Sequence, residues 1–249
     1  MSNPQLKKPR SSGRVSIIVN AKVKQEGRLI AASPVTERMV TALKNAIAAN
    51  SPDTIIDVIA VASLWSEVAQ RQTSIAGRIY CPLTIQLPKW LTFPAQTVYQ
   101  SCQDVLAHRL WVEEKLNCKT NHNLNWLGDL WLPIIWTENG PLYAEVIGEG
   151  MMPNAYQQPI KLADKLYQYV QTLAYKNLEA LEAPPSVYLL QFSVLSQEII
   201  FDRLWPFPAA PAIASLGRQT PDLFACHWYC LTNQEIPPIP LSPHQNALN

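Results

Sequence analysis

Residues 183–214 read APPSVYLLQFSVLSQEIIFDRLWPFPAAPAIA, and this stretch decides the fold that the sequence predicts. Val187–Val194 and Ile199–Trp205 are rich in β-branched, aromatic and long aliphatic residues, which suit a pleated, half-buried surface. A short polar connection joins the two runs at the length of a β-hairpin. Pro206 and Pro208 end the second run, because proline has no N–H to donate to the ladder. The stretch therefore predicts an antiparallel pair of strands.

Strict alternation in the second run places Asp202 and Arg203 on opposite faces of the strand, so these two side chains are not expected to pair with each other. Either one could be directed into a functional site. Each could equally form an ion pair with a neighbouring strand or helix, which is the commoner role of such residues. The following segment, residues 209–214, is expected to be extended and to lie on the surface.

A second hairpin is predicted upstream, where two apolar runs at residues 130–137 and 142–147 flank an Asn-Gly turn. Strands are also expected at residues 15–23, with a return through residues 28–32, and at an edge position over residues 77–87. Apolar residues at helical spacing, with serine and proline start signals, predict amphipathic helices at residues 34–50, 52–71, 94–116 and 160–182. Residues 55–61 are a strand in the alternative interpretation.

These elements predict an α+β fold, with an antiparallel sheet built from β-hairpins and three to four amphipathic helices packed on it. The expected organisation is a basic N-terminal tail (1–13), a single α+β domain (14–232) and a proline-rich C-terminal tail (233–249). The order helix, hairpin, helix, hairpin suggests either a degenerate repeat or a simple meander. The meander is favoured, because the halves share no residue-level identity.

The composition is that of a globular protein with an unusually uncharged surface. Hydrophobic residues make up 48% of the 249 residues, charged residues make up 16%, and the net charge is +1. A field that would attract nucleic acid or anionic lipid is therefore not expected from the whole molecule. The exception is a basic N-terminal cluster, interpreted as a solvated lead-in or as a nucleic-acid-binding arm (Lys7, Lys8, Arg10 and Arg14).

No apolar run in the chain approaches the ~18 residues that a membrane span needs, and no apolar signal core follows the basic cluster. The five cysteines are scattered, which indicates reduced thiols and a cytoplasmic protein. The eight glycines are few, and GxGxxG, GxxxxGK[ST], GxSxG and HExxH motifs are absent. Neither a catalytic residue nor a cofactor is predicted from these patterns.

Acidic residues allow one enzymatic alternative. Glu145 and Glu149 lie at the end of a predicted strand, and together with Asp202 they could bind a divalent cation in a metal-dependent hydrolase or a nuclease-like enzyme. The Asp/Glu-x-Lys partner of a nuclease motif does not follow them.

Thiols and imidazoles allow a second metal hypothesis. Cys118 and His122 have the same spacing as Cys226 and Cys230, so the four could form a tetrahedral zinc site if two distant loops meet. The alternative is that Cys226 and Cys230 are small buried hydrophobic residues near Trp228.

The chain has eight tryptophans, and aromatic residues are enriched at interface hot spots. Together with many prolines and few charges they predict a soluble, non-enzymatic protein of the adaptor or assembly-factor type that binds a macromolecule, with a protein as the favoured partner. The expected interaction surface consists of six aromatic residues (Trp126, Trp131, Trp136, Trp205, Phe207 and Trp228). The metal-dependent hydrolase and a nucleic-acid-binding protein are the alternatives.

Overall fold

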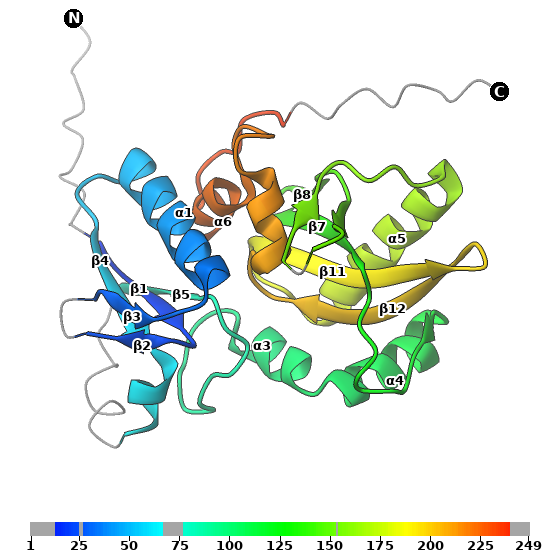
Figure 1. Cartoon of the computed structure of the whole chain (residues 1–249), viewed down its shortest axis with the longest axis horizontal. Coiled ribbons are helices and arrows are strands. Elements are labelled where there is room, and N and C mark those ends of the chain that lie inside the picture. The colour runs from blue at the N-terminus through cyan, green and yellow to red at the C-terminus, as the bar shows by residue number, and fades with distance from the viewer. Residues whose placement is uncertain (1–12, 25–26, 67–76, 153, 240–249) are drawn as a thin grey trace, which may run out of the picture.

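A small parallel sheet forms the N-terminal part of the molecule (Figure 1). The computed structural model describes residues 13–24, 27–66, 77–152 and 154–239. Its first strands, β1 (Arg14–Val19), β4 (Ile55–Ala60) and β5 (Arg78–Pro82), pair in parallel in the order β4-β1-β5. Because β1 is central, the chain moves to one side of it for β4 and to the other side for β5.

Helix α1 (Pro34–Asn50) makes the crossover from β1 to β4. It begins where the sequence predicts: Ser33 is the N-cap, its hydroxyl accepts a hydrogen bond from the Thr36 N–H at 3.1 Å, and Pro34 occupies the first turn. Its apolar stripe includes Val40, Leu43 and Ile47 and is buried. Beside this unit, β2 (Lys22–Val23) and β3 (Leu29–Ala31) form a separate antiparallel ribbon.

The larger sheet has the order β10-β9-β7-β11-β12-β6, and β8 pairs with β7 outside this path. Its long strands are β7 (Leu130–Thr137), β11 (Ser186–Leu195) and β12 (Glu198–Trp205), and the hairpin of β11 and β12 is confirmed. β12 ends at Trp205, directly before Pro206. The short strands complete the sheet: β6 (Lys119–Thr120), β8 (Gly140–Tyr143), β9 (Ile147–Glu149) and β10 (Tyr156–Gln157).

Three helices cover one face of the larger sheet (Figure 1). These are α3 (Gln96–Gln103), α4 (Val105–Leu116) and α5 (Asp164–Ala180), and their apolar side chains share a core with Leu132, Tyr188 and Phe201. Asp104 separates α3 from α4 and caps α4 by accepting a hydrogen bond from the Ala107 N–H at 3.0 Å. The sequence pattern had predicted these two helices as one.

The other face of the larger sheet shares a second core with the small sheet. This core contains residues of β1 and α1 together with Leu189 of β11, Phe224 and Trp228. The last two belong to α6 (Leu223–Leu231), which lies between the two sheets beside α1 (Figure 1). Two 3₁₀ helices, η1 (Val61–Trp65) and η2 (Ala210–Ser215), complete the described elements. Residues 209–214, expected as an extended surface segment, are largely in η2 and buried.

The predicted fold class, one antiparallel sheet of hairpins with helices packed on it, is wrong. The small sheet is parallel, and the larger sheet is mixed because β6 pairs with β12 in parallel. The helix predicted at residues 52–71 is instead the strand β4 followed by η1. A short apolar run fits a buried strand or a buried helix equally well, and its pairing with β1 decided the outcome.

The expected tails fall largely outside the described residues. Of the predicted N-terminal tail only Gly13 is described, and the C-terminal tail is described as far as residue 239. Within the described ranges, the structure contains no helix with the length and apolar character needed to span a bilayer.

Candidate functional site

A row of side chains crosses the central strands of the larger sheet on the face that shares a core with the small sheet. Gln191 of β11 pairs with Trp131 of β7 on one side and with Arg203 of β12 on the other. Directly paired residues on neighbouring strands project from the same face of a sheet. Trp205, two residues after Arg203, lies on this face as well, opposite Leu189. We refer to Trp131, Gln191, Arg203 and Trp205 as the sheet-face site.

Asp202 is the extra residue of a β-bulge in β12. Phe192 pairs with Phe201 and Gln191 pairs with Arg203, which leaves Asp202 without a partner in the ladder. The bulge changes the alternation, so the Asp202 and Arg203 side chains meet, with 2.9 Å between Arg203 Nε and Asp202 Oδ1. The expectation that they lie on opposite faces without pairing is therefore wrong. Asp202 Oδ2 also accepts a hydrogen bond from the Gly128 N–H at 2.8 Å.

Arg109 of α4 is the second cation paired with Asp202. Both side chains are fully buried, and the Arg109 guanidinium donates from Nη2 to Asp202 Oδ1 and from Nε to the Asp202 carbonyl at 3.0 Å. Its remaining hydrogen bonds reach three carbonyl oxygens of the polar loop that precedes β7, at 2.5, 3.0 and 3.1 Å (Asn121, Asn123 and Trp126). This guanidinium therefore holds the loop against β12.

Arg109 lies within the helix predicted at residues 94–116, where a charged side chain is normally expected on the solvated face, yet it is fully buried. α4 buries His108, Arg109 and Val112, while Leu106 and Leu110 are 37% and 46% exposed. Propensity and hydrophobicity favour leucine as the buried residue. The helix presents a guanidinium to the core because Arg109 pairs there with Asp202, which is distant in the sequence.

The Gln191 amide is held in one orientation. Its Nε2 donates to the Gly128 carbonyl at 2.6 Å, and its Oε1 accepts a hydrogen bond from Trp205 Nε1 at 2.8 Å. The ring of Trp205 also contacts Phe207, with 6.0 Å between centroids, and Phe207 stacks on Tyr99 at 5.9 Å. These contacts fix the middle of the sheet-face site.

The two ends of the row keep hydrogen-bond donors that have no acceptor among the described residues. Arg203 is 18% exposed, and its two Nη groups make no hydrogen bond to any described residue. Trp131 Nε1 is buried without a described partner, and its ring meets Tyr156 edge-on at 5.6 Å. Arg109 and Arg203 carry two positive charges against the one negative charge of Asp202. The site therefore favours an anion with several acceptor oxygens.

The structure brings together only part of the aromatic surface expected from sequence. Trp131, Trp205 and Phe207 share one face of the sheet, and Trp131 and Phe207 are 5% and 3% exposed. The other three lie elsewhere: Trp126 beside the Arg109 guanidinium, Trp136 against Tyr175 of α5, and Trp228 in α6 at 2% exposure.

The acidic residues of the hydrolase hypothesis do not form a metal site. Asp202 is buried between two guanidinium groups, whereas Glu149 is exposed on β9. Across the described ranges, no group of three or more His, Cys, Asp and Glu side chains could hold a metal ion, and these ranges include Glu145.

The zinc hypothesis fails as well, because all four of its residues lie in the described part of the chain and do not converge into such a group. His122 instead pairs with Glu113, with 2.7 Å between Nε2 and Oε2. Burial raises the pKa of the Cys118, Cys226 and Cys230 thiols, so these cysteines stay protonated and pack as small hydrophobic residues.

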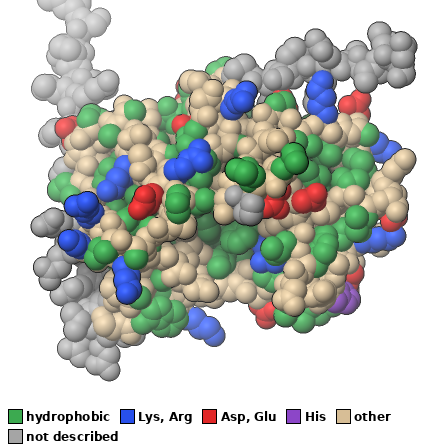
Figure 2. Space-filling view, viewed as in Figure 1, with side chains coloured by type: hydrophobic (Ala, Val, Ile, Leu, Met, Phe, Trp, Pro, Cys, Tyr) green, Lys and Arg blue, Asp and Glu red, His purple; other side chains and the backbone are tan. Residues whose placement is uncertain are grey.

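The basic N-terminal cluster is only partly described. Lys7, Lys8 and Arg10 lie outside the described residues, and Arg14 forms an ion pair with Asp57, with 2.7 Å between Nε and Oδ2. Figure 2 shows charges of both signs scattered among hydrophobic side chains on one face of the molecule, without a continuous basic area among the described residues of that face.

Comparison of the fold with solved structures gives a consistent result. An N5-carboxyaminoimidazole ribonucleotide synthetase from Thermus thermophilus matches with a TM-score of 0.64, 10% identity, and coverage of 90% of this chain and 79% of that chain. A carboxyaminoimidazole synthase from Aspergillus clavatus, in complex with ADP and 5-aminoimidazole ribonucleotide, gives a TM-score of 0.61, 11% identity, and coverage of 91% and 78%.

A third match is glycinamide-RNase-transformylase T from Mycobacterium tuberculosis, with a TM-score of 0.58, 14% identity, and coverage of 90% and 80%. The fold is that of the carboxyaminoimidazole ribonucleotide synthetases. In the two sequence-based comparisons, no family model matches the chain and no curated protein does.

The fold shared with these synthetases corrects the expectations about activity and binding partners that were drawn from the sequence. The solved proteins that share it are enzymes, which overturns the interpretation as a non-enzymatic adaptor or assembly factor. Three of these solved structures are complexes with ADP, with ATP, or with ADP and a ribonucleotide, which overturns a protein partner, and likewise nucleic acid, as the expected binding partner. The preference for docking surfaces rested in part on the tryptophan content, and six of the eight tryptophans belong to the two cores or pack against them.

Sequence reasoning missed Arg109, Gln191 and Gly128, which position the sheet-face site. A signal was available for one of them. Gln191 is a polar residue in the middle of an otherwise apolar run, a position where a buried amide needs partners on both sides. Gly128 and Arg109 carry no local signal, because Gln191 and Asp202, with which they pair, lie 63 and 93 residues away in the sequence.

Proposed function

We propose that this chain is an enzyme that acts on a ribonucleotide monophosphate held on the sheet-face site. The observation that carries the proposal is the row of Trp131, Gln191 and Arg203, which offers donors at both ends that no described residue accepts. The solved synthetases of this fold support this ligand class, since one of them is named for its complex with 5-aminoimidazole ribonucleotide. Because these solved proteins are enzymes, they also support the proposal that this chain acts on the ligand chemically.

Arg203 would bind the phosphate. A guanidinium presents paired N–H groups in a fixed fork that matches two phosphate oxygens, and Asp202 holds Nε so that both Nη groups remain available. Trp205, with the Arg203 guanidinium 5.8 Å from its ring centroid, would contact the ring of the ligand. Trp131 Nε1 would donate to an oxygen at the other end of the row.

A metal-bound triphosphate does not fit these residues. Nucleotide triphosphates in enzymes are commonly held with Mg²⁺, which takes oxygen ligands from carboxylates. Asp202, the carboxylate beside this site, is already occupied by two guanidiniums and a backbone N–H. We therefore assign charge neutralisation to Arg203 and expect binding of a monophosphate without a divalent cation.

Calorimetric titration of the purified protein with AMP tests the proposal. Saturable binding is expected, with the same affinity in EDTA and in Mg²⁺. Arg203→Gln should weaken binding about tenfold or more, since the loss of a charged hydrogen-bonded pair commonly costs at least about 1.4 kcal/mol. Arg203→Lys, which keeps the charge but not the fork, should give an intermediate affinity.

The matched control is Arg28→Gln, which removes an exposed guanidinium near β3 and should leave the affinity unchanged. Ribose 5-phosphate should also bind, and adenosine should bind far more weakly, because the phosphate contributes most of the interaction. Equal binding of AMP to the wild-type protein and to Arg203→Gln would show that the ligand lies elsewhere.

A cytoplasmic location is part of the same proposal. It is supported by the five cysteines, which are all free and buried, as thiols are in reducing compartments. Detection of the intact chain in separated cell fractions would test this location.

A further inference from the structure

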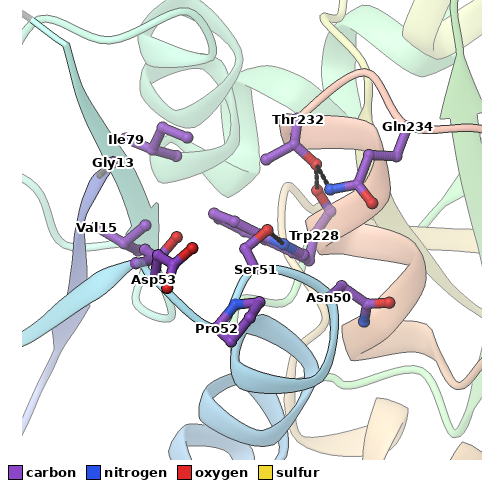
Figure 3. A pocket seen from close by; sticks show the side chains of 11 residues that line it. Gly13, Val15, Asn50, Ser51, Pro52, Asp53, Ile79, Trp228, Thr232 and Gln234 are labelled. Carbon is purple, nitrogen blue, oxygen red and sulfur yellow. Dashed lines mark hydrogen bonds between the residues drawn. The ribbon is translucent and has the colours of Figure 1, made fainter. Parts of the chain in front are cut away.

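A hollow of about 300 Å³ lies between the small sheet and the ends of two helices (Figure 3). Gly13, Thr54 and Ile79 line it from the amino ends of β1, β4 and β5. Ser51 caps the carboxyl end of α1, and Thr232 caps the carboxyl end of α6. Its volume is at the lower end of the range of small-molecule sites.

The electrostatics of this pocket favour a cation. The carboxyl end of a helix carries partial negative charge, and two such ends meet here. Asp53 is the one charged side chain among the described residues that line the pocket, which include no Lys, Arg or His. In Figure 3 the Asp53 carboxylate and the Trp228 indole approach the pocket from opposite sides.

A chain of hydrogen bonds fixes acceptor groups at the rim. The Thr232 hydroxyl donates to the Trp228 carbonyl at 2.6 Å and accepts a hydrogen bond from Gln234 Nε2 at 2.8 Å (Figure 3). Because the amide nitrogen of Gln234 is used in this way, its Oε1 remains an acceptor. The Ser51 hydroxyl accepts a hydrogen bond from Trp228 Nε1 at 3.2 Å.

Apolar groups form the rest of the wall. Val15 and Ile79 lie on the strand side, and the Trp228 ring lies on the helix side (Figure 3). An indole adds a favourable quadrupole interaction with a bound cation. We propose that this pocket binds a primary alkylammonium group, whose positive charge pairs with the Asp53 carboxylate and whose carbon chain contacts Ile79 and Trp228.

This pocket is separate from the sheet-face site. Open parallel sheets bind their usual ligands at the carboxyl ends of the strands, and this pocket lies at the amino ends. The inference therefore does not depend on the proposed ribonucleotide. It assigns a second ligand, of opposite charge, to the same chain.

Ligand-observed NMR with three compounds of similar size tests the assignment: butylamine, butanol and butyrate. Butylamine should bind saturably to the full chain near neutral pH, and butyrate should not bind. Asp53→Asn should weaken butylamine binding about fivefold, the effect of losing one exposed charge pair.

Glu37→Gln is the control, because it removes one negative charge from α1 outside the pocket and should leave butylamine binding unchanged. AMP binding to Asp53→Asn should equal that of the wild-type protein, which separates the two sites. Equal binding of butylamine and butanol would overturn the inference, as would wild-type amine binding by Asp53→Asn.

Discussion

Asp202 is the residue on which the sheet-face site depends most. Its carboxylate is fully buried and accepts hydrogen bonds from Arg109, Arg203 and the Gly128 N–H. A buried charge is tolerated when it is paired and its remaining lone pairs are satisfied, which is the case here. Removal of this one carboxylate would leave two guanidiniums without a counterion.

Asp202→Asn is expected to lower the free energy of unfolding by about 3–5 kcal/mol, the usual cost of breaking a buried ion pair. Urea denaturation would measure it. Glu198→Gln, on the same strand, is the control: Glu198 pairs with Lys119 at an exposed position, 53% and 65% accessible, and should change stability by less than about 1 kcal/mol. A small effect of Asp202→Asn would mean that water reaches this network.

His108 is expected to make the stability of the fold depend on pH. It is buried between α4 and α5, where it forms a 3.1 Å hydrogen bond with Asn177, and burial lowers its pKa from 6.5 to about 4. The unfolded chain takes up this proton at higher pH than the folded chain does. Stability is therefore expected to fall as the pH drops from about 6.5 to about 4, by roughly 3 kcal/mol for this group.

Urea midpoints of the wild-type protein and of His108→Gln across this pH window would check the prediction. The variant should lose less stability on acidification than the wild-type protein. His122→Gln, which removes a 58% exposed histidine from a surface pair with Glu113, is the control and should stay within about 1 kcal/mol of the wild-type curve. Parallel curves for all three proteins would contradict a neutral, buried His108.

At the scale of elements, the loop between α4 and β7 decides the shape of the sheet-face site. Arg109 holds this loop by donating hydrogen bonds to its carbonyl oxygens. The end of the loop lies against β11, where the Gly128 carbonyl accepts a hydrogen bond from Gln191. A Cβ at Gly128 would lie 2.6 Å from the Phe192 carbonyl oxygen. The close approach of two backbones therefore requires glycine at this position.

Gly128→Ala is expected to destabilise the fold by about 1–3 kcal/mol, as overpacking does, and to weaken AMP binding, because Gln191 loses its carbonyl partner. Thermal unfolding and the AMP titration would measure the two effects. Gly13→Ala is the comparison for stability, since its nearest neighbour would be 4.0 Å from the new Cβ. Equal stability of both variants would show that the loop can shift away from β11.

At the scale of the whole molecule, α6 connects the two sheets. Its residues Phe224 and Trp228 belong to the core that contains Val15 of the small sheet and Leu189 of the larger one. Because this core is continuous, the two sheets are expected to unfold together rather than one after the other.

Phe224→Ala should lower stability by about 3–5 kcal/mol in a single transition, since Phe224 is fully buried between the sheets. Hydrogen exchange would show whether the amides of β1 and β11 lose protection together. Leu195→Ala, at a position 53% exposed at the end of the β11–β12 hairpin, should have little effect. Loss of protection in one sheet alone would contradict a shared core.

The sequence predicted well those elements whose causes are local. The β11–β12 hairpin, the capped start of α1 and the end of β12 before Pro206 follow from propensity, capping and the missing proline N–H, which act within a few residues. All four residues of the sheet-face site lie in strands that the sequence predicts, but their alignment in one row depends on strand pairing and on the bulge at Asp202.

The sequence by itself determined the elements that have local causes, such as α1, β7 and the β11–β12 hairpin. The tertiary structure decided that β1 and β4 pair in parallel, that a bulge joins Asp202 to Arg203, and that Arg109 is buried. The physical reason is distance along the chain: Arg109 and Asp202 are 93 residues apart. A buried charge or a strand partner is chosen by what the rest of the fold places beside it, and no local pattern records that choice.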